Sequence, residues 1–226
     1  MLVAHFAHCV LAWLGQRLPS GVVLGKRASE SLDERLLRLA RTWGHTPARE
    51  RAVERFSLLG EHAGVWLAIG AGGAAVDRAR RSRWLRATAT VGGMYALNTA
   101  IKLVVRRRRP QLRGLPALTP TATALSFPSA HASTAFAGAL AYSRLGAPAA
   151  PLYVLAAGLS CSRLYLGVHY PSDVLAGALL GTAVAAVRGG ERDRASSASD
   201  ATAAHTRPSS NGHVPSNAVF VAGGPA

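Results

Sequence analysis

Residues able to handle a phosphate group gather in three short stretches of this 226-residue chain. They are Lys102 with Arg109-Pro110, then Pro128-Ser129-Ala130-His131, then Ser162-Arg163 with His169 and Asp173. The first supplies two cations, the second a hydroxyl, backbone donors and an imidazole, and the third a guanidinium with a His–Asp pair. Cleavage of a phosphate ester needs positive charge on the phosphoryl oxygens, a nucleophile and an acid for the leaving group. Together the stretches supply all of these without a metal ion.

In this order the stretches resemble the three signature motifs of the type 2 phosphatidic acid phosphatase superfamily. That superfamily includes membrane lipid phosphatases, acid phosphatases and vanadium haloperoxidases. The matching span, from Lys102 to Asp173, covers about a third of the chain. One departure is Ala130, which stands where the family usually has glycine. Alanine keeps the backbone N–H as a donor, but its methyl group narrows the approach if the backbone needs a positive φ.

The resemblance implies a role for each motif residue. His169 would attack phosphorus and form a phosphohistidine, with Asp173 fixing its tautomer. His131 would protonate the leaving oxygen and later activate water. The phosphoryl oxygens would be held by the remaining motif residues: Lys102, Arg109, Ser129, Arg163 and the Ala130 amide. The implied protein is an integral-membrane phosphatase that hydrolyses a phosphate monoester or pyrophosphate of a lipid-linked substrate, with no cofactor and no metal.

Within the family, the compact chain and the segment Phe56 to His62 resemble small actinobacterial enzymes similar to the decaprenylphosphoryl-5-phosphoribose phosphatases. Phosphatidylglycerophosphate, phosphatidic acid and a polyprenyl pyrophosphate remain open as substrates. Two other functions remain open as well. In a vanadate-dependent haloperoxidase the same pocket binds vanadate, although those relatives are soluble and larger. In a non-catalytic basic membrane scaffold the motif residues are structural, and His169→Ala leaves all function intact.

The composition favours a membrane over nucleic acid as the partner of this basic chain. Its net charge is +15, but aromatic residues make up only 6% and no base-reading motif is present. The arginines instead cluster between apolar runs, which is typical of membrane-flanking segments. The only cysteines, Cys9 and Cys161, exclude a disulfide framework, and the histidines outside the motifs show no metal-ligand spacing. The expected partners are therefore a lipid phosphate and the membrane.

Five apolar segments predict the architecture, and they cover residues 63–76, 87–105, 132–143, 145–162 and 174–187. A membrane-spanning helix needs about 20 residues, so several segments are short and burial in a soluble protein is the alternative. Gly177 with Gly181, and Gly70 with Ala74, have the spacing of close helix packing in lipid. No alternating strand pattern appears. We therefore expect an all-α, multi-pass transmembrane helical bundle in the cell membrane.

If the five segments alternate across the bilayer, all three motifs meet at one membrane face. Lys102 and Arg109 end the second segment, and His131 opens the third. Arg163 and Asp173 come from the end of the fourth and the start of the fifth. Two neighbouring groups have lesser expected roles: residues 106–108 hold lipid headgroups or water at the interface, and residues 61–62 are a minor substrate contact. The charge distribution does not fix which membrane face this is, and the oligomeric state stays open.

The chain divides into three predicted regions. Residues 1–55 form an amphipathic or interfacial region, residues 56–188 the phosphatase membrane domain, and residues 189–226 a disordered tail rich in Gly, Ser and Ala. In the first region Ser31 and Glu34 form a capping box before a helix that carries Leu32, Leu36 and Leu39. That helix either packs on a soluble domain or lies on anionic lipid. An apolar patch at residues 6–14 indicates a short interfacial helix, a cleaved signal or a misassigned start.

Overall fold

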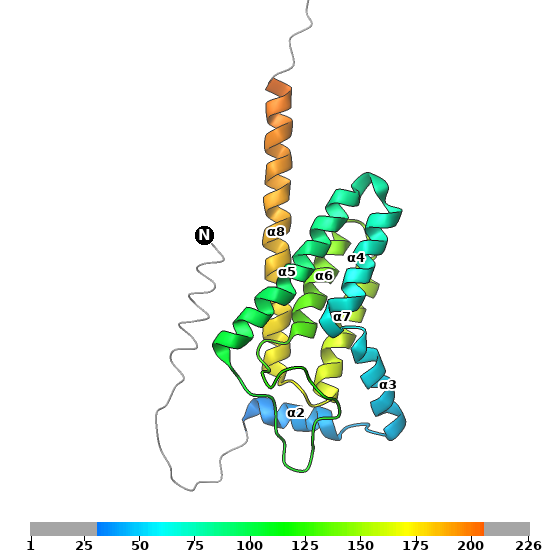
Figure 1. Ribbon diagram of the computed structural model, residues 1–226, viewed down its shortest axis with the longest axis vertical. Helices are drawn as coiled ribbons and strands as arrows, with labels where there is room; N and C mark the ends of the chain where they lie inside the picture. Colours follow the sequence, from blue (N-terminus) through cyan, green and yellow to red (C-terminus); the bar gives the residue numbers. More distant parts are fainter. Residues whose placement is uncertain (1–30, 206–226) are drawn as a thin grey trace, which may run out of the picture. The chain divides into compact units, whose positions relative to one another are not determined.

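The computed structural model describes residues 31–205, with side chains as far as residue 190, and within that range the regular structure is helical without any strand. The helices, coloured along the chain in Figure 1, are α2 (Leu32–Thr42), α3 (Pro47–Leu58), the short η1 (Glu61–Ala63), α4 (Gly64–Val76), the short η2 (Arg78–Arg80), α5 (Arg81–Val105), α6 (Ala130–Ser143), α7 (Ala149–Tyr165) and α8 (Pro171–His205). The predicted all-α class is confirmed for these residues. The apolar patch at residues 6–14 lies outside them.

Helix α6 forms the centre of the bundle and packs against α5, α7 and α8. Its buried positions carry small side chains, which allow neighbouring backbones to come close: Ala132, Ala135, Ala137, Gly138 and Ala139. On α8, a Cβ atom added at Gly181 would lie 2.0 Å from the carbonyl oxygen of Ser133. One added at Gly177 would lie 2.6 Å from that of Ser129. The close packing predicted from the Gly177–Gly181 spacing is therefore confirmed.

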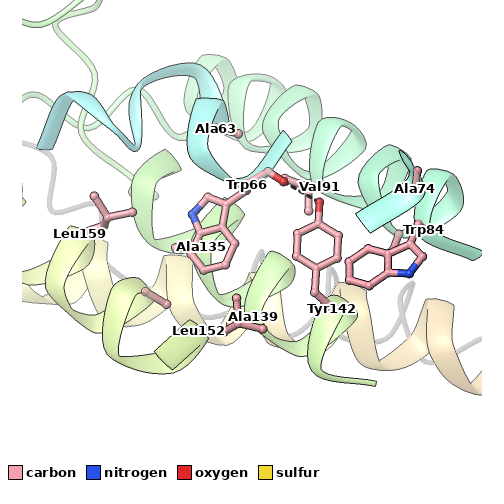
Figure 2. Close-up of a cluster of buried hydrophobic side chains, with 12 residues drawn as sticks. Ala63, Trp66, Ala74, Trp84, Val91, Ala135, Ala139, Tyr142, Leu152 and Leu159 are labelled. Atoms are coloured by element: carbon pink, nitrogen blue, oxygen red, sulfur yellow. Dashed lines mark hydrogen bonds between the residues drawn. The ribbon is translucent and has the colours of Figure 1, made fainter. Parts of the chain in front are cut away.

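Aromatic side chains fill the space where α4 and α5 meet α6 (Figure 2). The rings of Trp84 and Tyr142 stack with centroids 5.5 Å apart. The Tyr142 hydroxyl donates a hydrogen bond of 2.8 Å to the carbonyl oxygen of Trp66. Because a buried tyrosine hydroxyl needs such a partner, this bond links α6 to α4 inside an otherwise apolar core.

Each predicted apolar segment falls largely on a helix, but the bounds differ, and residues 145–148 of the fourth segment precede α7. Among the described residues, one segment, Pro171–Gly190 in α8, is long and apolar enough to cross a bilayer, with a mean hydropathy of 1.3. Helix α4 has 13 residues and a length of about 20 Å, against a hydrocarbon core of about 30 Å. Helix α5, with 25 residues, begins six residues before the predicted segment and includes Arg81, Arg83 and Arg86.

Helix α8 also extends beyond its predicted end. The composition predicts a disordered tail at residues 189–226. The backbone stays helical as far as His205, and residues 206–226 lie outside the described range. Extending an existing helix avoids the cost of nucleation, and the alanines and arginines that follow Gly190 are good helix formers. Propagation from the packed part of α8 accounts for a helix that continues past residue 189.

Helix α2 begins at Leu32, directly after Ser31, and packs against α7 and α8, whose lower ends it crosses in Figure 1. Leu37 is fully buried on the side that faces the bundle. The apolar stripe described above is not packed on the domain, because Leu32 and Leu39 are 72% and 65% exposed. Helix α2 therefore carries an apolar stripe that the other described residues leave exposed.

Candidate active site

Residues from all three motifs line one cavity of about 140 Å³. They are Lys102, Arg109, Ala130, His131, Arg163 and His169. Two further motif residues stand behind this lining: Ser129, whose hydroxyl caps α6 by accepting from the Ala132 N–H, and Asp173, which is fully buried. The structure thus brings residues of the three motifs together at one end of the helices.

Helix ends build the cavity. Lys102 lies in the last turn of α5, and Arg163 lies in the last turn of α7. Ala130 and His131 begin α6, and Asp173 lies in the first turn of α8. The N-terminus of α6 therefore brings the positive end of its dipole to the cavity, an arrangement that favours an anion.

His169 has one nitrogen directed at a cation and the other at a carboxylate. Its Nε2 atom lies 3.1 Å from Nη1 of Arg109, and because a guanidinium only donates, Nε2 is the acceptor. The proton of the neutral ring therefore sits on Nδ1, which lies 3.5 Å from Oδ2 of Asp173. That distance is an ion-pair contact longer than a good hydrogen bond, and Nδ1 has no hydrogen-bond partner.

The surroundings of His169 keep its imidazole neutral. Burial, and after it the positive charges of Arg109 and Lys102, hold the pKa of His169 well below its usual value of 6.5. A neutral imidazole has a lone pair on Nε2, so at neutral pH the ring can act as a nucleophile in a cavity full of positive charge.

His131 is held by a residue that the motifs do not include. Its Nε2 atom lies 3.1 Å from the carbonyl oxygen of Ser57 in α3, so Nε2 carries a proton and donates it. Nδ1 is then the atom left to exchange a proton with a substrate. The Ser57 hydroxyl also accepts hydrogen bonds from Arg163 Nη1 at 2.7 Å and from Ser162 at 3.1 Å. The sequence singled out Ser57 only as part of the segment from Phe56 to His62, which resembles small actinobacterial enzymes of the family.

The three cations differ in how they are held. The Lys102 ammonium donates to the carbonyl oxygens of Leu125 and Ser126, at 3.2 and 3.1 Å. Arg109 donates to the carbonyl oxygens of Thr123 and Val168, both at 2.8 Å. Arg163 has no ion pair among the described residues, and its Nε is buried without a hydrogen-bond partner. Because an unpaired buried donor of a guanidinium is costly, Arg163 is the cation most in need of an anion.

Arg107 corrects one prediction from the sequence. Residues 106–108 were expected at the interface with lipid headgroups or water, but Arg107 donates to Asp173 and to Asp33, both at 2.8 Å. The reason is the left-handed turn at Arg106 (φ 54°) that ends α5. After this turn the chain is extended, so Arg106 and Arg108 are exposed while Arg107 points inward. Neither the inward turn nor the partner Asp33 could be read from the motif spacing.

The rim of the cavity is polar and strained. Besides the motif residues it is lined by Glu61, His62, Tyr95, Thr99, Thr121 and Thr123. His62 and Ala63 have φ values of 51° and 60°, a conformation that costs energy for residues other than glycine. Such strain is retained mainly where the surroundings impose it, and it often marks a functional site. The predicted position of Glu61 and His62 beside the substrate agrees with this lining.

A larger cavity of about 1200 Å³ lies on the other side of Arg109. Its lining includes Arg106, Arg108 and Arg113 but neither His131 nor His169. Size alone therefore does not locate the chemistry, and the smaller cavity is the candidate active site.

Known proteins resemble this chain in sequence and in fold. Residues 83–188, which include all three motifs, match the family model of the PAP2 superfamily. The chain is 42% identical over 152 residues to the decaprenylphosphoryl-5-phosphoribose phosphatase of Mycobacterium tuberculosis (strain CDC 1551 / Oshkosh), covering 66% of this chain and 85% of that protein. For the protein of the same name from Mycolicibacterium smegmatis the identity is 43% over 128 residues, covering 56% and 68%.

Two crystal structures share the fold. One is Aquifex aeolicus LpxE, with a TM-score of 0.60 and 24% identity, covering 70% of this chain and 94% of that one. The other is the first transmembrane PAP2 type phosphatidylglycerolphosphate phosphatase from Bacillus subtilis, with a TM-score of 0.65 and 22% identity, covering 85% and 96%. At these identities the likeness shows the arrangement of helices and nothing of the substrate.

Proposed function

The chain belongs to the PAP2 superfamily and is a lipid phosphate phosphatase, and from that premise we propose that it removes the terminal phosphate of a polyprenyl-linked sugar phosphate through a phosphohistidine, without a metal. The observation that carries the proposal is the pairing of a neutral His169, with its lone pair on Nε2, and an Arg163 guanidinium that lacks an anionic partner. The first is a nucleophile, and the second needs the phosphate.

In the first step a phosphoryl group binds between Arg163, Lys102 and Arg109, and Arg109 exchanges its contact with His169 for a phosphoryl oxygen. Nε2 of His169 attacks phosphorus in line with the ester oxygen. The N–P bond forms while the P–O bond to the lipid alcohol breaks. Without an anion, burial and the positive charge of Arg163 lower the pKa of His131 to about 3, so the ring takes up its Nδ1 proton only once the anionic phosphoryl group has bound. His131 then gives this Nδ1 proton to the departing oxygen. Fixed cations stabilise the charge spread over the three equatorial oxygens.

In the second step water replaces the alcohol. His131, now neutral at Nδ1, takes a proton from the water molecule as it attacks phosphorus. The N–P bond breaks, inorganic phosphate leaves, and His169 and His131 return to their starting protonation states. Asp173 balances the positive charge that the His169 ring carries while it is phosphorylated.

Two observations support a sugar phosphate as the substrate. Relatives at 42% and 43% identity are named for a phosphoribose linked to a decaprenylphosphoryl group. In addition, the rim of the cavity presents an acid, an imidazole and several hydroxyl groups, which can hydrogen-bond the hydroxyls of a sugar. A plain alkyl alcohol would leave these groups without partners, at a cost in affinity.

We place the protein in the cell membrane with several helices across it, and with α2 lying in the membrane surface. The row of exposed leucines on α2 and Trp43, 83% exposed, suits the boundary between headgroups and acyl chains. Helix α2 also crosses the end of the bundle at which the cavity lies, since Asp33 bonds to the first turn of α8. A lipid-linked substrate would then reach the cavity from the same boundary.

The test is phosphate release by detergent-purified protein in the presence of EDTA. The panel contains a polyprenylphosphoryl pentose 5-phosphate, phosphatidic acid, phosphatidylglycerophosphate and a polyprenyl pyrophosphate. We expect the pentose phosphate to give the highest kcat/KM, and orthovanadate, which imitates the five-coordinate phosphoryl group, to inhibit. Loss of all activity with EDTA, restored by Mg²⁺, would contradict the metal-free mechanism.

A second measurement addresses the intermediate. Brief mixing with labelled substrate should place an acid-labile, base-stable phosphate on the wild-type protein and none on His169→Asn. Turnover of His169→Asn and His131→Asn should fall by about 10² to 10⁶, the range for loss of a nucleophile or a general acid. Near wild-type turnover in either variant would show that the assigned roles are wrong.

A further inference from the structure

Asp173 faces His169 on one side, and its two hydrogen-bond donors, Arg107 and Tyr170, lie outside the cavity lining. Its Oδ1 atom accepts from Arg107 at 2.8 Å. Its Oδ2 atom accepts from the backbone N–H of Tyr170 at 2.8 Å and faces Nδ1 of His169 at 3.5 Å. Both carboxylate oxygens are therefore occupied, and the Tyr170 and Arg107 contacts fix how the carboxylate presents itself to His169.

Arg107 is itself held from two directions. Its Nη2 atom donates to Oδ2 of Asp33 at 2.8 Å, and its guanidinium carbon lies 4.1 Å from the centre of the Tyr170 ring. Asp33 also accepts from the backbone N–H of Ser172 at 3.0 Å and from the Ser172 hydroxyl. A continuous path of charge-assisted hydrogen bonds thus runs from Asp33 through Arg107 to Asp173, ending beside His169.

Asp33 belongs to the face by which α2 is attached. Asp33, Leu37 and Arg41 are spaced four residues apart and so share one side of the helix. Leu37 is fully buried, and Arg41 donates to the carbonyl oxygens of Tyr165 and Pro116, at 3.1 and 2.8 Å. Arg41 also packs closely against the backbone of Gly167, where an added Cβ atom would lie 2.7 Å from Nε of Arg41. A larger residue at position 167 would therefore disturb the attachment of α2.

We propose that Asp33 and Arg107 are positioning residues for the nucleophile. They hold the Asp173 carboxylate that orients His169, so the catalytic site is complete only when α2 is docked across the ends of α7 and α8. This inference rests on the proposed role of His169 as the nucleophile. It adds two residues to the three motifs. Arg107 lies between Lys102 and Arg109, inside the first motif, and Asp33 lies far upstream of that motif.

The physical reason is the burial of Asp173. A fully buried carboxylate that loses its cation is an uncompensated charge, which the site relieves by turning, by taking up a proton or by admitting water. In each case Oδ2 stops being a fixed acceptor for Nδ1 of His169. The ring then loses the orientation that directs Nε2 to phosphorus, and a displacement of about 1 Å can reduce the rate by about 10². Phosphate binding is spared, because neither Asp33 nor Arg107 lines the cavity.

Three variants test the inference on the detergent-purified full chain with the pentose phosphate substrate: Arg107→Gln, Asp33→Asn and the double variant. We expect Arg107→Gln to lower kcat by about 10²-fold and Asp33→Asn, which leaves the Arg107–Asp173 pair in place, by about tenfold. KM and the inhibition constant of orthovanadate should stay within about threefold. The double variant should be no slower than Arg107→Gln alone, since both residues act along one path.

Matched controls separate position from charge. Arg108→Gln removes the neighbouring, exposed arginine, and Arg35→Gln removes an exposed charge from α2 itself; both should keep wild-type kcat. Arg107→Lys should recover part of the loss, because it keeps the charge but has no fork to reach Asp33 and Asp173 together. Should Arg107→Gln fail to yield folded protein, Asp33→Asn and Arg107→Lys decide.

The inference is overturned if Asp33→Asn and Arg107→Gln retain kcat within about twofold, if their losses multiply in the double variant, or if orthovanadate inhibition weakens in step with kcat. The proposed function fails in a different way. In that case the wild-type protein releases no phosphate from any substrate of the panel, or His169→Asn is as active as the wild type.

Discussion

Ser57 contacts both His131 and Arg163: its carbonyl oxygen lies 3.1 Å from Nε2 of His131, and its hydroxyl lies 2.7 Å from Nη1 of Arg163. One residue of α3 therefore sets the ring of the proposed acid and the guanidinium of the phosphate clamp at the same time. With the Nε2 proton held by a backbone carbonyl, only Nδ1 of His131 remains for proton exchange with the substrate. A residue that precedes the first motif thus helps to build the candidate active site.

The space around His131 leads to a first prediction, at Gly60. A Cβ atom at this position would lie 2.6 Å from Cδ2 of His131, closer than real Cβ contacts allow. Its φ of −87° is ordinary, so the obstacle is space and not backbone conformation. We expect Gly60→Ala to displace the ring and to lower kcat by about tenfold or more. Gly72→Ala, where nothing lies within 4 Å, is the control, and equal activities of the two variants would contradict the prediction.

A second prediction concerns the contact between α6 and α8. At Gly181 an added methyl group meets the backbone of Ser133, at 2.0 Å from its carbonyl oxygen, and backbone cannot turn aside as a side chain can. Gly181→Ala should lower the free energy of unfolding by about 1–3 kcal/mol or more. Thermal melting in detergent measures this as a drop in Tm. Gly93→Ala on α5, with no atom within 4 Å, should melt at the wild-type temperature or slightly above it.

The three cations should differ in their tolerance of exchange. Arg163 lacks an anionic partner and is expected to meet two phosphoryl oxygens with its planar fork, which lysine does not have. Arg163→Lys should therefore lose about 10²-fold in kcat/KM although the charge is kept. Lys102 acts as a point charge already held by two carbonyl oxygens, so Lys102→Arg should lose less. Equal, small losses at both positions would indicate a diffuse field in place of a clamp.

The pH profile is a fourth test, and its direction follows from His169. Burial and the charges of Arg109 and Lys102 lower the pKa of His169 well below 6.5, so its neutral form persists as the pH falls through 6.5 and disappears only near the lowered pKa. We expect no His169 limb in kcat/KM between about pH 7.5 and 6, once the separately titrated phosphate of the substrate is allowed for. An acid limb centred at or above 6.5 that persists after this correction would contradict the assignment.

The same shift affects stability, with a sign that can be checked. Below about pH 6.5 the unfolded chain binds a proton at His169 that the native chain does not, so the free energy of unfolding rises with pH in this window. Above about pH 6.5 His169 is neutral in both states and does not lower the free energy of unfolding. Below that pH, protonation of His169 in the unfolded chain lowers the free energy of unfolding. In His169→Gln, a side chain that does not titrate, this part of the pH dependence should be absent from chemical unfolding in detergent.

Local patterns predicted the helices and the meeting of the motifs, because both depend on residues close in sequence. Lys102, Ala130 and Arg163 lie at helix ends, and ends of successive antiparallel helices meet at one face. The contacts that hold the site in place are of another kind. Asp33 reaches Arg107 across 74 positions and Ser57 reaches Arg163 across 106, so no spacing rule connects them.

Arg107 illustrates why composition misleads in such a case. In a run of four arginines each residue has the same chemistry, and the run as a whole reads as a solvated or lipid-facing edge. The left-handed turn at Arg106 decides which of them points inward, and that turn follows from where α5 ends. The position at which α5 ends therefore decides that Arg107, and not Arg106 or Arg108, points toward Asp173. That position depends on tertiary structure.

The tight contact of α6 with α8 also bears on how such enzymes evolve. Because Gly177 and Gly181 of α8 rest on the backbone of α6, direct backbone contact holds together the two helices whose first turns carry His131 and Asp173. The connecting segments at residues 61–63 and 121–123 also line the cavity, and the contact between α6 and α8 does not fix them. Substitutions in these connectors can therefore change which lipid alcohol fits the cavity while the residues proposed to cleave the phosphate stay the same. Enzymes of this fold can then hydrolyse different lipid phosphates by the same reaction.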